Sequence, residues 1–402
     1  MDERRRQLLG AGAVGLTAFG ASAGLSGALE GVAAQEPPPG SVISVTAFGA
    51  RGDGTGDDGD ALRRALAWAS DRHAKTAGAT PRLYVPGGIY PYEVSPNFAV
   101  TALALDCAPG VVFYHRGAGS AFVLDGGART DGTYRTRISG APVVQGNARS
   151  TIGLDVRALH HAFVSASVRD VAVAALRTRW AVGTEFRIRT SGLGIGGNNP
   201  NPVDGVILDA RAPEETTSDC LFHLPIIEQV RNVGIRLVRA NACTFVSGTL
   251  EANGMGGVHV EKGSNNNLFI GLDLEFNGRF GILCEGNRNG FLGVYDDKLA
   301  IFAGVGNWVR GNQFNAVVNR GDGNAFEMMG YAAAAGTFTD TGTNTHKMLV
   351  RNLTNGQLDV DHRADIAAST LSASGVDLAD REARNAVAEL TARLKKTGVL
   401  RD

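Results

Sequence analysis

The middle of the chain repeats itself every 22 to 24 residues. Phenylalanine recurs at spacings of 23, 24 and 22 residues, at Phe222, Phe245, Phe269 and Phe291. An acidic residue follows each phenylalanine at the same offset: Glu228, Glu251, Glu275 and Asp297. Short β-prone runs broken by Asn and Gly at this period are typical of a solenoid whose repeats each form one coil of parallel strands. The repeat therefore predicts an all-β, single-stranded parallel β-helix.

Composition excludes several other classes of protein. The chain has 402 residues and is 44% hydrophobic, which provides for a large core and excludes intrinsic disorder and a small disulfide-stapled scaffold. Its 39 Lys and Arg balance 40 Asp and Glu, so no basic field is available for nucleic acid. The 54 glycines show no Gly-X-Y period, which excludes collagen and suits a chain that turns often.

Residues 1–34 resemble a twin-arginine signal peptide. Arg5 and Arg6 precede a mildly apolar run rich in Gly and Ala, and residues 32–34 (VAA) are small, as a signal peptidase requires. A membrane anchor is the alternative, and the glycines weaken it because a span needs about 20 predominantly apolar residues. We expect a periplasmic or secreted protein, exported by the twin-arginine route, with no membrane attachment after cleavage.

The rest of the chain is predicted to have three parts. A short Pro-rich linker spans 35–41, the β-helix spans 42–375, and a C-terminal helix spans 376–402. The apolar residues of that helix share one stripe, which suits either a cap on the end of the solenoid or association with further copies.

Two motifs flank a predicted helix near the start of the solenoid. Residues 48–58 read FGARGDGTGDD, and residues 84–90 read YVPGGIY. This passage resembles the opening of the pectate-lyase superfamily, which includes rhamnogalacturonase-like and epimerase-like enzymes, polygalacturonase relatives and phage tailspikes. The resemblance implies a right-handed parallel β-helix with a capping helix at its N-terminal end. It does not name a reaction, because one fold hosts many functions.

Equivalent residues of adjacent coils lie about 4.7–4.9 Å apart and form columns. The four acids of the repeat are predicted to form one column, with Asp273 and Asp296 beside it. Strict alternation between 269 and 276 points the apolar even positions, from Ile270 to Phe276, inward and the carboxylates outward. The phenylalanines then share the outward parity, so the backbone must bend near each of them.

Stacked carboxylates repel one another, which raises the pKa of some members. A polysaccharide lying along them would meet one carboxyl protonated as general acid and another ionised as base or nucleophile. We therefore predict an enzyme that cleaves the glycosidic bonds of an extended polysaccharide by hydrolysis. Glu251, Glu275 and Asp273 are the central catalytic candidates, with Glu228 and Asp297 as further members. Coil spacing leaves retaining and inverting chemistry open.

Three other interpretations remain. The acids are hydrated surface groups neutralised by Arg231, Lys262, Arg279 or Lys298. Alternatively, the protein is a uronate lyase that acts by β-elimination, which needs a basic side chain near an ion or arginine that neutralises the uronate carboxylate, so calcium stays open as a cofactor in this case. The substrate-binding candidates are His259, Lys262, Arg279 and Lys298. Finally, it is a tailspike-like protein that binds glycan without cutting it.

Hydrolysis by carboxylates needs no cofactor and no metal, and we predict neither. Cys220 and Cys243 occupy equivalent positions one coil apart, so they are either stacked buried thiols or a disulfide. The resemblance to tailspikes leaves a monomer and a homotrimer both open.

Overall fold

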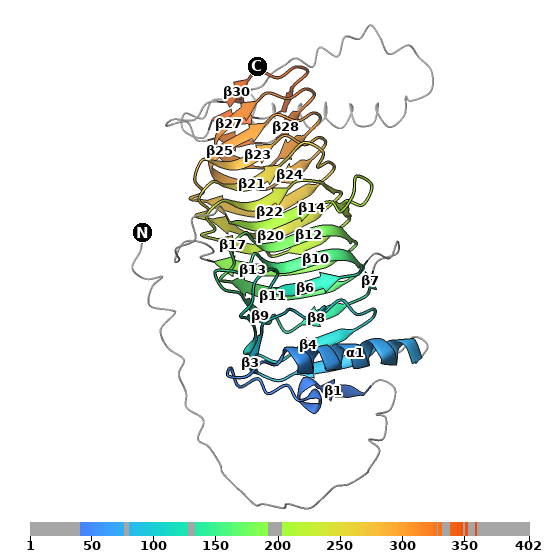
Figure 1. The fold of residues 1–402 in the computed structure, drawn as a ribbon. Coiled ribbons are helices and arrows are strands. Elements are labelled where there is room, and N and C mark those ends of the chain that lie inside the picture. Colours follow the sequence, from blue (N-terminus) through green and yellow to red (C-terminus); the bar gives the residue numbers. More distant parts are fainter. Residues whose placement is uncertain are drawn as a thin grey trace, which may run out of the picture. The chain divides into compact units, whose positions relative to one another are not determined.

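The computed structural model describes residues 41–75, 80–127, 133–191, 203–327, 329–331, 338–348, 350–352 and 358–359. Over these residues the chain winds as a right-handed parallel β-helix, and its strands pair in parallel except β32 with β33 (Figure 1). This confirms the fold class that the repeat and the resemblance predicted. The signal segment 1–34, the linker up to residue 40, residues 360–375 and the C-terminal helix predicted at 376–402 lie outside the described residues.

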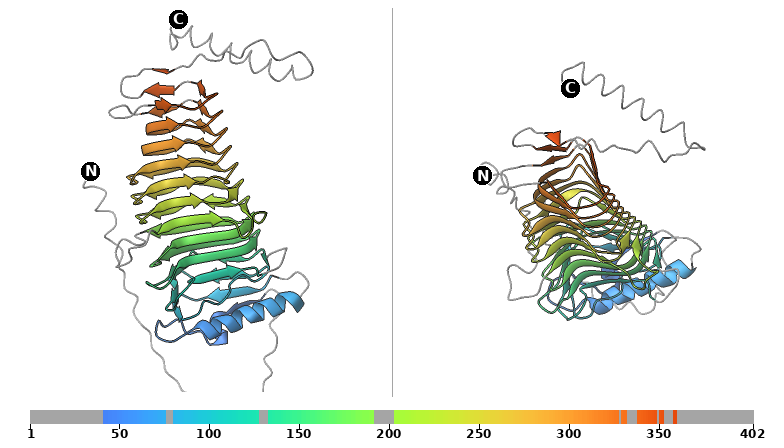
Figure 2. Two further views of the ribbon diagram at one scale, coloured as in Figure 1. Left: turned by 45° about the horizontal axis from the view of Figure 1, so that its top comes forward. Right: turned by 90° about the horizontal axis from the view of Figure 1, so that it is seen from above.

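Equivalent segments of successive coils pair with one another and form three stacks of strands (Figure 2). The first stack contains β6 (Phe122–Asp125), the first parts of β10 (Ile152–His160) and β12 (Ala174–Val182), β14 (Asp204–Asp209), β18 (Val233–Leu237), β21 (Gly256–Val260), β23 (Phe280–Cys284), the second parts of β25 (Tyr295–Phe302) and β27 (Gln313–Asn319), and β30 (Phe338–Asp340). Short strands continue it at one corner: β7 (Thr133–Tyr134), β15 (Thr217–Ser218) and β19 (Ala240–Asn241).

The second stack contains β1 (Val42–Ser44), β2 (Arg82–Val85), β4 (Ala104–Cys107), β8 (Arg137–Ser139), the first parts of β11 (Phe163–Arg169) and β13 (Glu185–Ser191), β16 (Leu221–His223), the first parts of β20 (Thr244–Glu251) and β22 (Leu268–Glu275), β24 (Gly290–Leu292), β26 (Trp308–Arg310), β28 (Ala325–Glu327) and β31 (His346–Met348).

The third stack contains β3 (Gly88–Tyr92), β5 (Val111–His115), β9 (Val143–Gln145), the second parts of β11 and β13, β17 (Ile226–Glu228), the second parts of β20 and β22, the first parts of β25 and β27, β29 (Gly330–Tyr331), β32 (Val350–Asn352) and β33 (Leu358–Asp359).

The repeated phenylalanines form a ladder inside the coils. Phe222, Phe245, Phe269 and Phe291 are fully buried, and their rings stack with centroids 4.6 to 4.8 Å apart. Each buried side chain of this size contributes about 1.5–3 kcal/mol by leaving water, and aromatic contact adds to it. The period of the sequence is thus the period of the interior packing.

Buried asparagines satisfy the backbone at one corner of the coils. Asn267 Oδ1 accepts a hydrogen bond from the Cys243 amide at 3.0 Å, Asn289 accepts from Asn267 at 3.0 Å, and Asn307 accepts from Asn289 at 2.8 Å. A second ladder joins Asn253 and Asn277, which lie in the turn after the acidic positions. Because each rung uses a donor or acceptor that would otherwise be buried without a partner, these residues specify where a coil turns.

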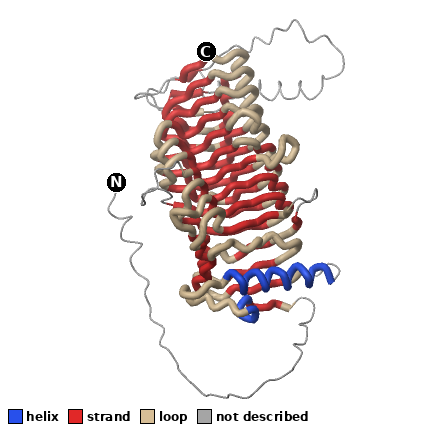
Figure 3. Tube along the Cα trace, viewed as in Figure 1, coloured by secondary structure: helices blue, strands red, loops and turns tan. Residues whose placement is uncertain are grey.

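A helix covers the N-terminal end of the interior (Figure 3). A short 3-10 turn, η2 (Val45–Phe48), precedes the glycine-rich motif, and α1 (Gly59–Lys75) follows it. Asp57 Oδ1 accepts from the Gly59 amide at 2.7 Å, whereas the buried Asp58 carboxylate accepts from the amides of Arg51 and Gly52 at 2.8 and 3.2 Å. One aspartate therefore begins the helix and the other holds the loop, which confirms the predicted capping helix.

All four cysteines are buried and free. Cys220 and Cys243 lie on successive coils, and their thiols hydrogen-bond backbone carbonyls, Cys220 to Ser218 at 3.3 Å and Cys243 to Asn241 at 3.6 Å. Of the two alternatives, the structure therefore contains stacked thiols.

Candidate functional site

The repeated acids stand in register on the third stack. Strand pairing places Glu228 opposite Glu251, and Glu251 opposite Glu275. Asp297 continues the column by a different contact, because both of its carboxylate oxygens accept from the Phe276 amide at 3.0 Å. Asp273 lies two residues before Glu275 on the same strand. We call these five residues the acidic strip.

One bend in each long strand brings the carboxylates to the surface. Ser247 (φ +50), Gly271 (φ +60) and Gly293 (φ +62) occupy it in successive coils, in the left-handed backbone region that glycine enters at little cost. The bend shifts the side-chain parity, so that Phe269 and Leu272 both point inward although they are three residues apart. The predicted inward orientation of Ile270 and Phe276 is therefore wrong: Ile270 is half-buried, and Phe276 is 55% exposed.

The spacing of the coils fixes the separation of the acids. On the second stack, the phenylalanine rings of the same coils lie 4.6 to 4.8 Å apart, so registered acids on adjacent coils have a backbone spacing near the ~5–5.5 Å of retaining glycosidases. Asp273 and Glu275 are separated along one strand by about 6.6 Å, within the ~6.5–9.5 Å of inverting enzymes. The backbone spacing of the strip therefore suits either geometry.

Asp273 differs from its neighbours in its surroundings. It pairs in register with Thr249 and Tyr295, and its buried Oδ1 has no hydrogen-bond partner among the described residues. Partial burial, together with the charge of Asp297, raises the pKa of Asp273. The strip therefore holds one carboxyl with a greater tendency to stay protonated than an ordinary aspartate.

Asp296 lies beneath the strip rather than beside it. Its side chain is 1% exposed and occupies a core position, opposite Leu274 on the preceding coil. Oδ1 accepts from the Lys298 amide at 2.8 Å, while Oδ2 has no partner among the described residues. Burial and the nearby Asp297 charge raise the pKa of Asp296 to about 7. Alternation along the strand could not reveal this position, because an aspartate at a core position breaks the pattern.

Two aromatic rings are exposed beside the acids. Tyr295 is 37% exposed and lies next to Asp273 on the adjacent coil, and Phe276 directly follows Glu275. Burial and the surrounding carboxylates, Glu275 first among them, raise the pKa of Tyr295, so its hydroxyl stays protonated near neutral pH. Exposed rings beside polar groups are suited to the faces of sugars.

The predicted basic residues separate into two groups. Lys298 directly follows Asp297, and the exposed Arg279 lies in the turn between β22 and β23. By contrast, His259 lies on the first stack with Nε2 3.1 Å from Glu285 Oε2, and Lys262 follows the same strand. The structure therefore does not bring His259 and Lys262 next to the acidic strip, because residues close in sequence belong to different stacks. Glu228, Glu251, Asp273 and Asp297 form no ion pair with any described lysine or arginine.

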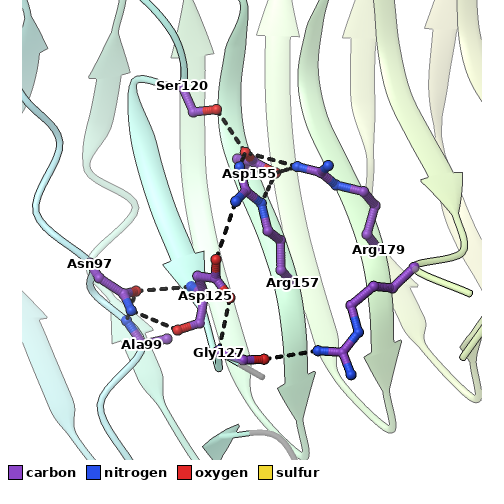
Figure 4. Close-up of polar contacts among 9 residues, drawn as sticks. Asn97, Ala99, Ser120, Asp125, Gly127, Asp155, Arg157 and Arg179 are labelled. Atoms are coloured by element: carbon purple, nitrogen blue, oxygen red, sulfur yellow. Dashed lines mark hydrogen bonds and ion pairs between the residues drawn. The ribbon is translucent and has the colours of Figure 1, made fainter. Parts of the chain in front are cut away.

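A second charged cluster, which sequence reasoning missed, lies on the first stack (Figure 4). Asp155 is 1% exposed and binds Arg157 on its own strand, Arg179 on the next coil at 2.8 Å, and the Ser120 hydroxyl at 2.7 Å. Arg157 also reaches Asp125 at 3.2 Å. Burial favours the neutral acid, but the hydrogen bonds from both arginines and Ser120 outweigh it and lower the pKa of Asp155. Its partners come from three coils, so no local sequence signal marks it.

The described residues contain no group of three or more His, Cys, Asp or Glu side chains arranged to hold a metal ion. Among the same residues, no helix has the length and apolar character needed to cross a membrane.

Comparisons with known proteins return likenesses of fold. No protein-family model and no curated protein matches the chain. The chain is similar to Geobacillus virus E2 ORF18, with 15% identity and a TM-score of 0.49, over 77% of this chain and 60% of that one. It is also similar to the A-module of the Azotobacter vinelandii mannuronan C-5 epimerase AlgE6 (17% identity, TM-score 0.47, 76% and 99% covered). A third similar structure is the Yersinia enterocolitica family 28 exopolygalacturonase (11% identity, TM-score 0.43, 79% of each chain covered).

Proposed function

We propose that the protein is an exported enzyme that hydrolyses glycosidic bonds of an extended polysaccharide with the carboxylates of the acidic strip. One observation carries the proposal: a partly buried carboxyl with a raised pKa, Asp273, lies beside other carboxylates at glycosidase spacing. Pairs of acids whose surroundings separate their pKa values are the usual arrangement for acid and base roles.

Asp273 takes the role of general acid. Its raised pKa lets it keep a proton at a pH where exposed carboxylates are ionised, and it gives that proton to the leaving glycosidic oxygen. The proton then moves from the Asp273 oxygen to the departing sugar hydroxyl as the bond between the anomeric carbon and that oxygen breaks.

Glu275 or Glu251 supplies the second carboxylate. Glu275, about 6.6 Å along the strand, leaves room for a water molecule, which it deprotonates for attack on the anomeric carbon. Glu251 lies diagonally to Asp273 on the preceding coil and is the alternative base. Tyr295 and Phe276 provide exposed ring faces for neighbouring sugars.

A lyase is the second candidate, and the observation that favours it is Lys298. This residue directly follows Asp297 and provides a cation at the strip, as β-elimination requires for a uronate carboxylate. In that mechanism a basic side chain removes the proton next to the carboxylate, and the leaving oxygen departs with a new carbon–carbon double bond.

The test is to incubate the mature protein with acidic and neutral polysaccharides while following reducing ends and ultraviolet absorbance. Hydrolysis gives reducing ends without absorbance, whereas elimination gives both because it forms an unsaturated uronate. Glu275→Gln and Glu251→Gln identify the base, and Asp71→Asn, which removes an exposed carboxylate from α1, is the matched control. Full activity in Asp273→Asn and in both glutamate variants would remove the strip from the mechanism.

A further inference from the structure

The third stack carries a pocket on the N-terminal side of the acidic strip. It measures about 310 Å³ and lies across β11, β13 and β17, with Val143 and Ile226 at its apolar ends. Its polar lining includes Ser167, Arg169, Arg189 and Ser191. Ser191 pairs in register with Glu228, so the pocket continues directly into the strip.

The two guanidinium groups of this pocket have no carboxylate partner among the described residues. Arg169 Nη2 donates to the neutral amide of Gln145 at 2.7 Å, and the adjacent Asp170 accepts from Gln145 at 3.2 Å instead of from Arg169. Arg189 is exposed, and its guanidinium makes no hydrogen bond or ion pair with any residue that the structure describes.

The outward arginines on the strands of the first stack are compensated. On the first stack, carboxylates pair with each of these: Arg157, Arg177, Arg179 and Arg236. The pocket thus presents two uncompensated guanidinium groups beside the hydroxyls of Ser167 and Ser191, and guanidinium binds carboxylate and sulfate through paired hydrogen bonds.

The distance between the pocket and the acids limits the ligand. Arg189, Ile226, Thr249 and Asp273 are successive members of one column, so three coil steps, about 14 Å, separate the pocket from the proposed general acid. A polymer charged on every sugar would place anions over the carboxylates of the strip, where like charges repel. A polymer with widely spaced charges avoids this repulsion.

We propose that Arg169 and Arg189 form an anion-binding subsite that selects a sparsely charged polysaccharide, with one anionic substituent in the pocket and neutral sugars over the acidic strip. This inference rests on the proposed function, because it assigns the substrate class of the same enzyme. The substituent is a carboxylate or a sulfate ester, since both fit the guanidinium pair.

Binding measurements test the subsite independently of cleavage. Titration calorimetry on the full chain carrying Asp273→Asn compares dextran, lightly carboxymethylated dextran, lightly sulfated dextran and polygalacturonate. At least one lightly charged dextran should bind about tenfold more tightly than either dextran or polygalacturonate, a difference of about 1.4 kcal/mol. The better of the two lightly charged dextrans identifies the anion.

Variants assign the preference to the pocket. Arg169→Gln with Arg189→Gln should abolish the tenfold preference, and Arg189→Lys should keep part of it because the charge remains. Arg320→Gln, which removes an exposed arginine after β27, should leave binding within twofold. Thermal unfolding confirms that each variant is folded.

Two results overturn the proposal: equal binding of charged and neutral dextrans, or tighter binding of polygalacturonate than of both lightly charged dextrans. A charge preference that persists in a protein without hydrolytic activity supports the subsite and contradicts only the proposed reaction. Hydrolysis without a charge preference supports the proposed reaction and contradicts the subsite.

Discussion

The Asp155 cluster on the first stack and the acidic strip on the third stack use the same coil spacing in opposite ways. In the cluster, Arg157 and Arg179 are paired in register on adjacent coils, and Asp155 binds both of them. In the strip, Glu228, Glu251 and Glu275 are paired in register, so each acid lies opposite another acid. Opposite charges from adjacent coils stabilise the cluster, whereas a column of like charges is the arrangement that the proposed hydrolysis requires.

The largest difference expected between the two regions is in catalysis. Asp273→Asn should lower kcat by 10²- to 10⁴-fold because it removes the general acid, whereas Asp155→Asn should leave kcat per folded molecule unchanged. The activity that depends on protonated Asp273 should decline as pH rises through its raised pKa, above the ordinary 3.8. Initial rates across a pH series measure both effects, and an equal loss of kcat in both variants would contradict the assignment.

The next expected effect concerns Asp296 beneath the strip. Its pKa is about 7 in the folded protein and near 3.8 when exposed, so the folded state binds the extra proton between these values. Stability from this group is therefore highest below pH 3.8 and falls as pH rises to 7, by a total of about 4 kcal/mol.

Asp296→Asn removes this dependence. The variant should be more stable than the wild type at pH 8, and the difference between the two should shrink at pH 5. Urea unfolding at both pH values measures it, with Asp71→Asn as the exposed control. A difference that grows toward low pH would contradict the raised pKa.

The contribution of Asp155 to stability should depend on pH in the opposite direction to that of Asp296, and the effect should be smaller. Its pKa is lowered in the folded protein, so its contribution is present above pH 3.8 and is lost as pH falls through the folded value. Asp155→Asn should lower the free energy of unfolding at pH 7 by about 2 kcal/mol, below the usual cost of breaking a buried pair, because both arginines are about a third exposed. Chemical unfolding at pH 7 and pH 3 checks the size and the sign, and a larger loss at pH 3 would contradict it.

The fold could be predicted from the sequence because the residues that pack inside the coils recur at the period of one coil. Phe222 to Phe291 and the asparagines at the corners repeat with the coil, and each is buried against its own equivalent. The register of Glu228, Glu251 and Glu275 follows from the same period.

The details of the site could not be predicted from the alternation of apolar and polar residues along a strand. Gly271 and Gly293 recur at the bend inside otherwise β-prone runs. An isolated glycine within such a run is a signal for a bend, so the orientations of Ile270 and Phe276 were open to prediction. The Asp155 cluster and the pocket around Arg189 were not open to prediction. Their members lie on different coils, which strand pairing brings together and which no local sequence pattern connects.

The smallest expected effect sets the baseline for the whole comparison. Arg310 and Glu327 form an exposed pair on the second stack, with 3.8 Å between Nε and Oε2, and they pair in register on adjacent coils. Water screens such a pair and its side chains lose freedom to form it, so a double-mutant cycle with Arg310→Gln and Glu327→Gln should give a coupling energy of at most about 0.5 kcal/mol. If this pair couples as strongly as Asp155 and Arg179, then coil register alone creates strong pairing, and burial is not what distinguishes the Asp155 cluster. A weak coupling between Arg310 and Glu327 and a strong coupling between Asp155 and Arg179 would assign the difference to burial.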